Sequence, residues 1–528
     1  MEVKTTRYLG LWIDQTLNGA THTRHIKQRV QKDLQALRFL KGASWGNRPY
    51  EQLVLYKTVV LPKIEYGATV YLWPRTTNIK TLQKCQNQAL RPILGVVKTS
   101  PINSMHAIAG LPPLQYKITT YSLQHLLQLC VKSPAIYEQI SQLNQRFESV
   151  ALRKYATTKT GLNFLIDMIN QYNVFLPGEH ELGLRVLGLT HESAFVTAIP
   201  GVSKSNQHHL QAEAKTKTME FLERYKNHVQ IYTDGAKNDQ GVGSAFYCNT
   251  HKLGTAIRQH DITSSYNAEI IAIEMALEHV LHSHAPDSEI VILSDSKSAI
   301  AALKKMRIGD APPTNLIRIH QLLRVIQQQA TKTVIQWVIS HCGIPLNELV
   351  DKLAVRACQR ENVNCSTTTY YEDCKGIIQD DQDSKWQHSF ADCDGAGSWT
   401  RAVINHPLKM PWFKNRNDFD NRTISTINRI LIGHGRTNSF LAQMKKRDIP
   451  TCDRCDLDEE QNMQHLLLRC RHTTSMLQQI FAKHSVSVPI NPGTLTDLHR
   501  FLRECVNTGN MEPLKDVAET LSLLDVKL

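Results

Sequence analysis

Residues 229–236 read VQIYTDGA, an apolar run that ends in Asp234 and Gly235. Residues 289–296 read EIVILSDS and repeat this pattern, with Asp295 near the end. Runs of this length and composition are typical of buried β-strands. A single Asp at the end of a strand is most often a cap or a turn residue. That interpretation changes only when four carboxylates follow one another in the sequence, each with its own flanking pattern.

Two further carboxylates lie on predicted helices. Glu269 follows YNA at 266–268 and opens a helix with apolar residues at helical spacing, namely Ile270, Ile273, Ala276, Leu277 and Val280. Asp351 begins the helix that follows the predicted strand 334–339. From residue 228 to 360 the order is strand, strand, strand, helix, strand, helix, helix, strand, helix. This order predicts an α/β fold with a mixed five-stranded sheet flanked by helices.

Four clustered carboxylates predict a metal site, because carboxylates that lie close together repel each other and raise each other's pKa. They stay ionised only with cations between them. Hard oxygen ligands select Mg²⁺ or Mn²⁺. Two such ions roughly 4 Å apart can activate a water and stabilise the leaving oxygen of a phosphodiester. The pattern therefore indicates two-metal phosphodiester hydrolysis.

The motifs of this region closely resemble the type 1 RNase H family. They are YTDGA at 232–236, NAE at 267–269, LSDSKSA at 293–299, SHCGI at 340–344 and NELVD at 347–351. The resemblance implies that the metal ligands are Asp234, Glu269, Asp295 and Asp351. It implies that His341, on a loop, assists hydrolysis or product release, and that the substrate is the RNA strand of an RNA–DNA hybrid.

Two positions beside these motifs depart from the family pattern. Leu346 stands where relatives often have Gly, and Ile339 stands where many have Pro before the histidine loop. Both lie next to the predicted site, so we expect them to alter the shape of the loop and the rate without removing a ligand.

The whole chain of 528 residues has a net charge of +13, and the excess of basic residues is concentrated in its first part. Residues 1–228 hold 28 Lys and Arg against 14 Asp and Glu, whereas residues 229–360 hold 13 against 12. Such a basic block is typical of nucleic-acid binding and equally of a solvated basic surface. No signal peptide or membrane-spanning run is visible. We therefore expect an intracellular protein, cytoplasmic or nuclear. Its twelve cysteines are then free thiols or metal ligands.

The first 120 residues resemble the region after the polymerase palm in non-LTR retrotransposon reverse transcriptases. The motifs are YLG at 8–10, LPKIEYG at 61–67, LQKCQNQALRPILG at 82–95, and His106 with AGLPPL at 109–114. In that family this region is the thumb and connection, which grip template and primer. No Ala-Asp-Asp type polymerase motif is found, so we expect a C-terminal part of an element's polyprotein that does not polymerise DNA.

A cysteine and histidine cluster lies near the C-terminus. Cys452, Cys455, His465 and Cys470 have the spacing C-x2-C-x9-H-x4-C, which suits a closed tetrahedral zinc site. With LIGHGRTN at 431–438, the cluster resembles the zinc-knuckle region of the same elements, from insects in particular. A role in nucleic-acid binding follows from that resemblance and from the nearby basic residues Lys445, Lys446, Arg447, Arg469 and Arg471.

The sequence predicts six consecutive regions. They are a thumb and connection-like region at 1–120, a helical connection and linker at 121–227, the RNase H domain at 228–360, an acidic linker at 361–400, a basic region with the zinc motif at 401–478 and a helical tail at 479–528. The preferred function is a metal-dependent endoribonuclease, and the alternative is an inactive nucleic-acid-binding remnant of a retroelement. A DNA transposase or integrase shares the fold, but its third carboxylate falls late in the chain, unlike Glu269.

Overall fold

The computed structural model describes residues 4–42, 45–71, 76–148, 156–176, 194–202, 211–283, 288–306, 314–329, 331–363, 369–392, 395–484, 494–526 and 528. These residues form two compact units. One contains residues 1–122, 152–158 and 380–528, and the other contains 123–151 and 159–379. Within the described part of the chain, no helix is long and apolar enough to cross a membrane.

The second unit is built around a six-stranded mixed sheet with strand order β3-β8-β7-β4-β5-β6. The strands are β3 (Phe195–Val196), β4 (Val229–Asn238), β5 (Gly241–Cys248), β6 (Leu253–Gln259), β7 (Glu289–Ser294) and β8 (Lys332–Trp337). β4, β5 and β6 are antiparallel neighbours, while β7 runs parallel to β4 and β8 parallel to β7. The five predicted strands are confirmed. The sheet has a sixth strand, β3, whose two residues are too few to show a periodic pattern.

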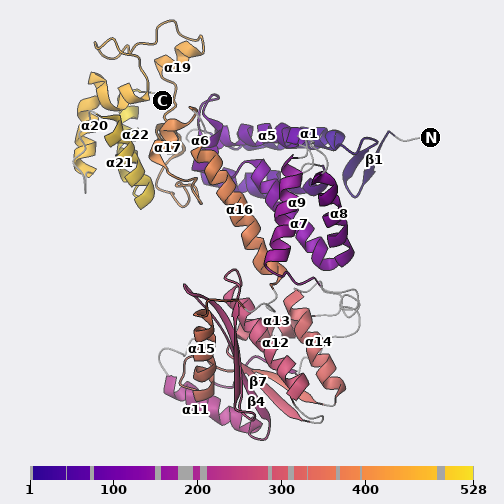
Figure 1. The fold of residues 1–528 in the computed structure, drawn as a ribbon. Helices are drawn as coiled ribbons and strands as arrows, with labels where there is room; N and C mark the ends of the chain where they lie inside the picture. Colours follow the sequence, from indigo (N-terminus) through magenta and orange to yellow (C-terminus); the bar gives the residue numbers. More distant parts are fainter. Residues whose placement is uncertain are drawn as a thin grey trace. The chain divides into compact units, whose positions relative to one another are not determined.

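Helices cover both faces of this sheet (Figure 1). They are α11 (Gln211–Leu222), α12 (Ser265–Ser283), α13 (Lys297–Lys305), α14 (Thr314–Gln328) and α15 (Pro345–Cys358), with a 3-10 turn at Glu223–Tyr225. Gly235 of β4 faces α12, and Gly243 of β5 faces α15. Because Gly243 pairs with Ala236, the residue after Gly235, these two glycines point to opposite faces of the sheet. The two helices therefore lie on opposite sides of β4 and β5.

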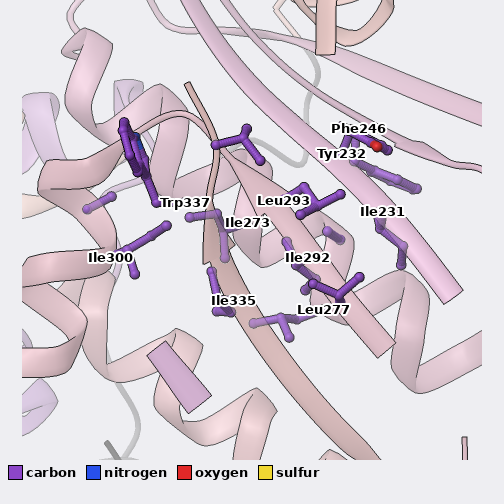
Figure 2. Packing of buried hydrophobic residues seen from close by; sticks show 14 of the residues in the cluster. Ile231, Tyr232, Phe246, Ile273, Leu277, Ile292, Leu293, Ile300, Ile335 and Trp337 are labelled. Atoms are coloured by element: carbon purple, nitrogen blue, oxygen red, sulfur yellow. The ribbon is translucent and has the colours of Figure 1, made fainter. Parts of the chain in front are cut away.

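Apolar side chains from the strands and from α12 and α13 fill the core of this unit (Figure 2). Ile231, Ile292 and Ile335 come from three neighbouring parallel strands, and all three are fully buried. Leu277 of α12 and Ile300 of α13 pack against them. Burying such side chains stabilises a domain by about 1.5–3 kcal/mol each. The sheet is thus held by its own core, independently of any bound ion.

Three helices precede the sheet in sequence: α7 (Leu114–Lys132), α8 (Pro134–Glu148) and α9 (Ala156–Gln171). A fourth, α16 (Tyr371–Ala391), follows it and occupies much of the segment 361–400, which the sequence predicted to be an acidic linker. The acidic composition of the segment, rich in Thr, Asp, Gly and Ser, suggested a linker. Its helix was missed although the buried Cys374, Ile378, Trp386 and Phe390 are separated by multiples of four residues, as on one face of a helix. The other predicted region boundaries stay predictions.

The first unit is mainly helical. Before α7 it contains a hairpin of β1 (Thr5–Tyr8) and β2 (Leu11–Asp14), then α1 (Ala20–Phe39), α2 (Pro49–Leu55), a π-helix (Tyr56–Val60), α3 (Leu61–Glu65), α4 (Ala68–Tyr71), α5 (Thr76–Leu94) and α6 (Ile102–Ala109). After α16 it contains α17 (Ser398–Val403), α18 (Asn421–Ile432), α19 (Asn438–Gln443), a π-helix (His465–Arg469), α20 (Arg471–His484), α21 (Leu495–Thr508) and α22 (Glu512–Leu523).

Segments from both ends of the chain pack together in this first unit. The buried Asn428 Nδ2 donates to the Leu94 carbonyl over 2.9 Å, and Arg429 Nε donates to the Gly95 carbonyl over 2.7 Å. The Thr400 hydroxyl donates to the Ser104 hydroxyl over 2.7 Å. The predicted regions 1–120 and 401–478 therefore share one folded unit rather than forming separate bodies.

Candidate functional site

The fold brings three of the predicted ligands together. Asp234 lies in β4, Glu269 lies near the N-terminus of α12, and Asp295 directly follows β7. One carboxylate oxygen of each lies within 4.8 Å of those of the other two. Asp351 interacts with the Asp234 carboxyl from the second turn of α15. The sequence had placed Asp351 at the start of its helix, but α15 begins at Pro345 because proline is favoured in a helix's first turn.

Gly235 makes this assembly possible. A Cβ at this position would lie 2.3 Å from the Glu269 backbone nitrogen, so any other residue would push α12 away from β4. The buried Ser244 hydroxyl on β5 donates to the Ala268 carbonyl over 2.7 Å and holds the same helix end. The approach of α12 to β4 places Glu269 beside Asp234.

The carboxylates are held in an unfavourable environment. Burial raises the pKa of Asp234 to about 8, and the neighbouring Asp295 and Asp351 add to the increase. Burial and the charges of Asp234 and Asp295 also raise the pKa of Glu269 well above its usual value. Glu269 Oε2 is buried without a hydrogen-bond partner. A buried oxygen of this kind is costly unless something binds it, and a hard cation is the ligand that this donor set fits.

An aspartate from outside the predicted domain supports the site. Asp373, at the start of α16, accepts hydrogen bonds from the Ser264 backbone nitrogen over 3.1 Å and from Asn267 Nδ2 over 2.7 Å. The Ser264 hydroxyl accepts from the Asn267 backbone nitrogen over 3.2 Å and caps α12 two residues before Glu269. Asp373 therefore holds the residues that form this cap. Asp373 was not predicted to be a site residue, because it lies in the segment predicted to be a linker.

Comparison with known proteins agrees with this geometry. Residues 226–359 match the family model described as RNase H. A ribonuclease H of Tropheryma whipplei (strain Twist) is 30% identical over 142 residues, which cover 25% of this chain and 84% of that protein. The chain belongs to the ribonuclease H family. The match coincides with the sheet unit that carries the carboxylates, and the predicted RNase H-like fold is confirmed.

The chain is also similar to a retrotransposon protein. A 115 kDa protein in the type-1 retrotransposable element R1DM of Drosophila melanogaster is 26% identical over 130 residues, or 24% of this chain. The match spans only 12% of that protein's length. It confirms the predicted resemblance to a retrotransposon protein, while the thumb-like and zinc-knuckle resemblances of the flanks stay predictions.

His341 lies in the loop between β8 and α15 of the ribonuclease H domain. It is exposed, and its φ of 51° lies in the left-handed region, as does that of Gly343 at 76°. Cys342 and Ile344 on either side of Gly343 are buried and anchor the loop. Among the described residues, the tight group of ligand oxygens includes neither His341 nor Asp351. The structure thus groups three predicted residues, adds Asp351 through Asp234, and leaves His341 on an exposed loop.

The cysteine and histidine cluster forms a second candidate metal centre, in the other unit. Its four ligand atoms lie within 4.8 Å of one another. The Cys452 and Cys470 sulfurs are 3.8 Å apart, and Cys455 Sγ is 3.4 Å from His465 Nε2. With Zn–S and Zn–N distances of about 2.3 and 2.05 Å, a tetrahedral site has S–S and S–N edges of about 3.8 and 3.5 Å. The observed spacings fit that geometry.

Neighbouring groups orient these ligands. His465 Nδ1 donates to Glu459 Oε2 over 3.0 Å, which directs Nε2 toward the sulfurs. Burial raises the pKa of Cys452, but hydrogen bonds, chiefly from Gln461, outweigh burial and lower it to about 7. A low pKa favours the thiolate, which is the form that binds metals.

The basic residues around this cluster are partly neutralised. Arg447, Arg469 and Arg471 form ion pairs with Asp453, Glu459 and Asp456 respectively. Lys445 and Lys446 are exposed. The predicted basic surface near the cluster is therefore smaller than the count of its residues suggests.

Proposed function

We propose that this chain is a metal-dependent endoribonuclease that cuts the RNA strand of RNA–DNA hybrids. The observation that carries the proposal is the group Asp234, Glu269 and Asp295, whose oxygens lie within 4.8 Å of one another with one buried Glu269 oxygen unsatisfied. Membership of the ribonuclease H family supports the substrate class. The basic residues of 1–228 are suited to attract the phosphate backbone.

The residues divide the work as follows. Asp234, Glu269, Asp295 and Asp351 would hold two Mg²⁺ or Mn²⁺ ions, which supply an activated water and stabilise the leaving oxygen of a phosphodiester. Asp234 lies at the centre of the four carboxylates, because the charges of Asp295 and Asp351 both raise the pKa of its carboxyl. The exposed His341 would assist hydrolysis or product release from its loop beside the site.

We further propose that Cys452, Cys455, His465 and Cys470 hold a structural zinc ion. The donor set is closed, with three sulfurs and one imidazole and no position for a substrate. The ion would order the segment around residues 451–470, whose regular structure is a single β-bridge, Thr451 with Glu460, and a five-residue π-helix. A nucleic-acid-binding role for this segment is part of the proposal.

Cleavage of a hybrid labelled on both strands tests the catalytic proposal. The full chain is incubated with the hybrid, with and without Mg²⁺, and no chelator is used, so that any zinc stays bound. The expected result is Mg²⁺-dependent cutting of the RNA strand alone, which Asp234→Asn abolishes. Asp239→Asn is the matched control, because Asp239 is an exposed aspartate in the turn that follows β4. Duplex DNA and duplex RNA of the same sequence should stay intact.

Two results would contradict the catalytic proposal. If the chain binds the hybrid yet neither Mg²⁺ nor Mn²⁺ supports cutting, the enzyme proposal fails and the inactive nucleic-acid-binding remnant takes its place. Cutting that Asp234→Asn leaves unchanged would also overturn the site assignment.

A further inference from the structure

A second, unassigned group of metal-binding side chains lies in the ribonuclease H domain. Cys248 is the last residue of β5, His251 lies in the turn between β5 and β6, and His279 lies on α12. One ligand atom of each lies within 4.8 Å of those of the other two. A thiol and two imidazoles form a donor set quite different from the carboxylates of the same domain.

This group is separate from the carboxylate site. Cys248 pairs with Ile231 at the start of β4, whereas Asp234 pairs with Ala245, three residues earlier in β5. Three residues of strand span about 10 Å. On α12, His279 lies ten positions after Glu269, about 15 Å along the helix. The two groups occupy opposite ends of the same pair of elements.

The two histidines already have the spacing of zinc ligands. His251 Nδ1 and His279 Nε2 are 3.2 Å apart. Two nitrogens bound to one tetrahedral zinc ion at about 2.05 Å lie about 3.3 Å apart. In the metal-free state the two nitrogens share a proton in a hydrogen bond, and an ion would replace that proton.

The surroundings of His279 favour ligation through Nε2. Its Nδ1 lies 3.3 Å from the Ser283 hydroxyl, one turn further along α12. When Nδ1 carries the proton and donates it to Ser283, the lone pair of Nε2 points toward His251 and can serve as the ligand. The Phe246 ring lies 5.0 Å from the His279 ring and packs against it. Similar partners orient metal-binding histidines in general.

We propose that Cys248 Sγ, His251 Nδ1 and His279 Nε2 form a zinc site. One thiolate and two imidazoles suit Zn²⁺ and exclude Mg²⁺, which prefers oxygen ligands. Three protein ligands leave the fourth position to water or to an external ligand. Cys248 is buried. Because the metal binds the thiolate, the thiol must release a proton to solvent when the ion binds. The ion ties the β5–β6 turn to the helix that carries Glu269.

Zinc content of the untagged full chain tests this proposal. The chain is saturated with Zn²⁺, freed of excess metal by gel filtration and analysed by atomic emission. His279→Gln is expected to lose one equivalent of zinc per chain relative to the unsubstituted protein. His282→Gln should lose none, since His282 is an exposed histidine on the same helix, three positions further on. Cys452→Ser removes the zinc of the other cluster and shows that the two losses are independent.

Cobalt and a second variant complete the test. Co²⁺ bound at this site in the Cys452→Ser background should show the absorption of tetrahedral cobalt with a single thiolate, and His251→Gln should abolish it. His251 lies in an exposed turn, so its replacement leaves the core intact. Equal zinc content in the unsubstituted chain, His279→Gln and His251→Gln, with folding confirmed by near-ultraviolet circular dichroism, would overturn the proposal.

Discussion

The carboxylate group and the Cys452 cluster are assembled in opposite ways. Asp234, Glu269 and Asp295 come from a strand, a helix and the end of a second strand, spread over 62 residues. The donors of the Cys452 cluster all lie within residues 452–470. In the first group the sheet forces like charges together, and in the second a short segment gathers donors that already contact each other.

Because of this difference, we expect the fold to depend on a bound metal ion at the Cys452 cluster but not at the carboxylate group. The sheet has an extensive apolar core (Figure 2), so the ribonuclease H domain should fold without Mg²⁺. In the metal-free domain the carboxylates lie close together in an unfavourable, repulsive arrangement. The segment that holds the Cys452 cluster has little regular structure, so zinc should contribute directly to its folding. Under the proposed function, one site would hold a metal that acts on the substrate, and the other would hold a metal that stabilises the fold of its segment.

The largest effect that follows from this comparison is on cleavage. Glu269→Gln should lower hybrid cleavage by more than about 100-fold, because even the partners of metal ligands commonly cost about 10- to 100-fold. Its zinc content and its fold should not change. Glu278→Gln on the same helix is the control, since Glu278 forms a partly exposed ion pair with Arg318 and a pair of this kind contributes little. A Glu269→Gln chain that cleaves at the normal rate would remove Glu269 from the site.

A substitution in the Cys452 cluster should alter the fold of its segment and leave cleavage almost unchanged. Cys452→Ser is expected to lose the zinc of its cluster and to open the segment around residues 451–470 to proteolysis, while single-turnover hybrid cleavage stays within about two-fold. Limited proteolysis with mass spectrometry locates the new cuts. Cys505→Ser is the control, a buried cysteine of the same unit outside the cluster. Cleavage lost in parallel with zinc would show that the two centres depend on each other.

The same contrast explains what the sequence could predict. The carboxylates were predictable because each sits at the end of a strong local pattern, as VQIYTD does before Asp234. The zinc cluster was predictable because its ligands have a fixed spacing. Asp373 was not, because its contact with Asn267 joins residues far apart in sequence, and the acidic composition of 361–400 concealed the buried apolar face of α16. The packing of Asn428 against Leu94 likewise leaves no local sign in either segment.

A smaller effect should come from the partner of a zinc ligand. Glu459→Gln removes the charge that accepts the proton of His465 Nδ1. Zinc affinity is expected to fall by about 10- to 100-fold, the usual cost of losing such a partner. Competition with a chromophoric chelator measures the change. Glu460→Gln is the matched control, because the neighbouring Glu460 contacts Ser439 and not the cluster. Equal affinities for both variants would mean that His465 is oriented by the backbone alone.

The smallest effect distinguishes the two groups by pH. The folded-state pKa of Asp234 is raised to about 8 from an ordinary 3.8. Between these values the folded protein binds more protons than the unfolded chain, so the free energy of unfolding falls as pH rises from about 4 to about 8. The slope is limited to about 1.4 kcal/mol per pH unit for one group.

Asp234→Asn should lack this contribution. In Mg²⁺-free buffer without chelator, the variant is expected to gain stability over the unsubstituted chain as pH rises from 5 to 8, measured by urea unfolding. Added Mg²⁺ should reduce that gain, since cations favour the ionised carboxylates that the variant has partly lost. Asp239→Asn, which replaces an exposed aspartate in the turn after β4, should show no such divergence. A constant difference between Asp234→Asn and the unsubstituted chain at every pH would mean that the carboxylates are not held apart from water, and that the fold places no strain on the site.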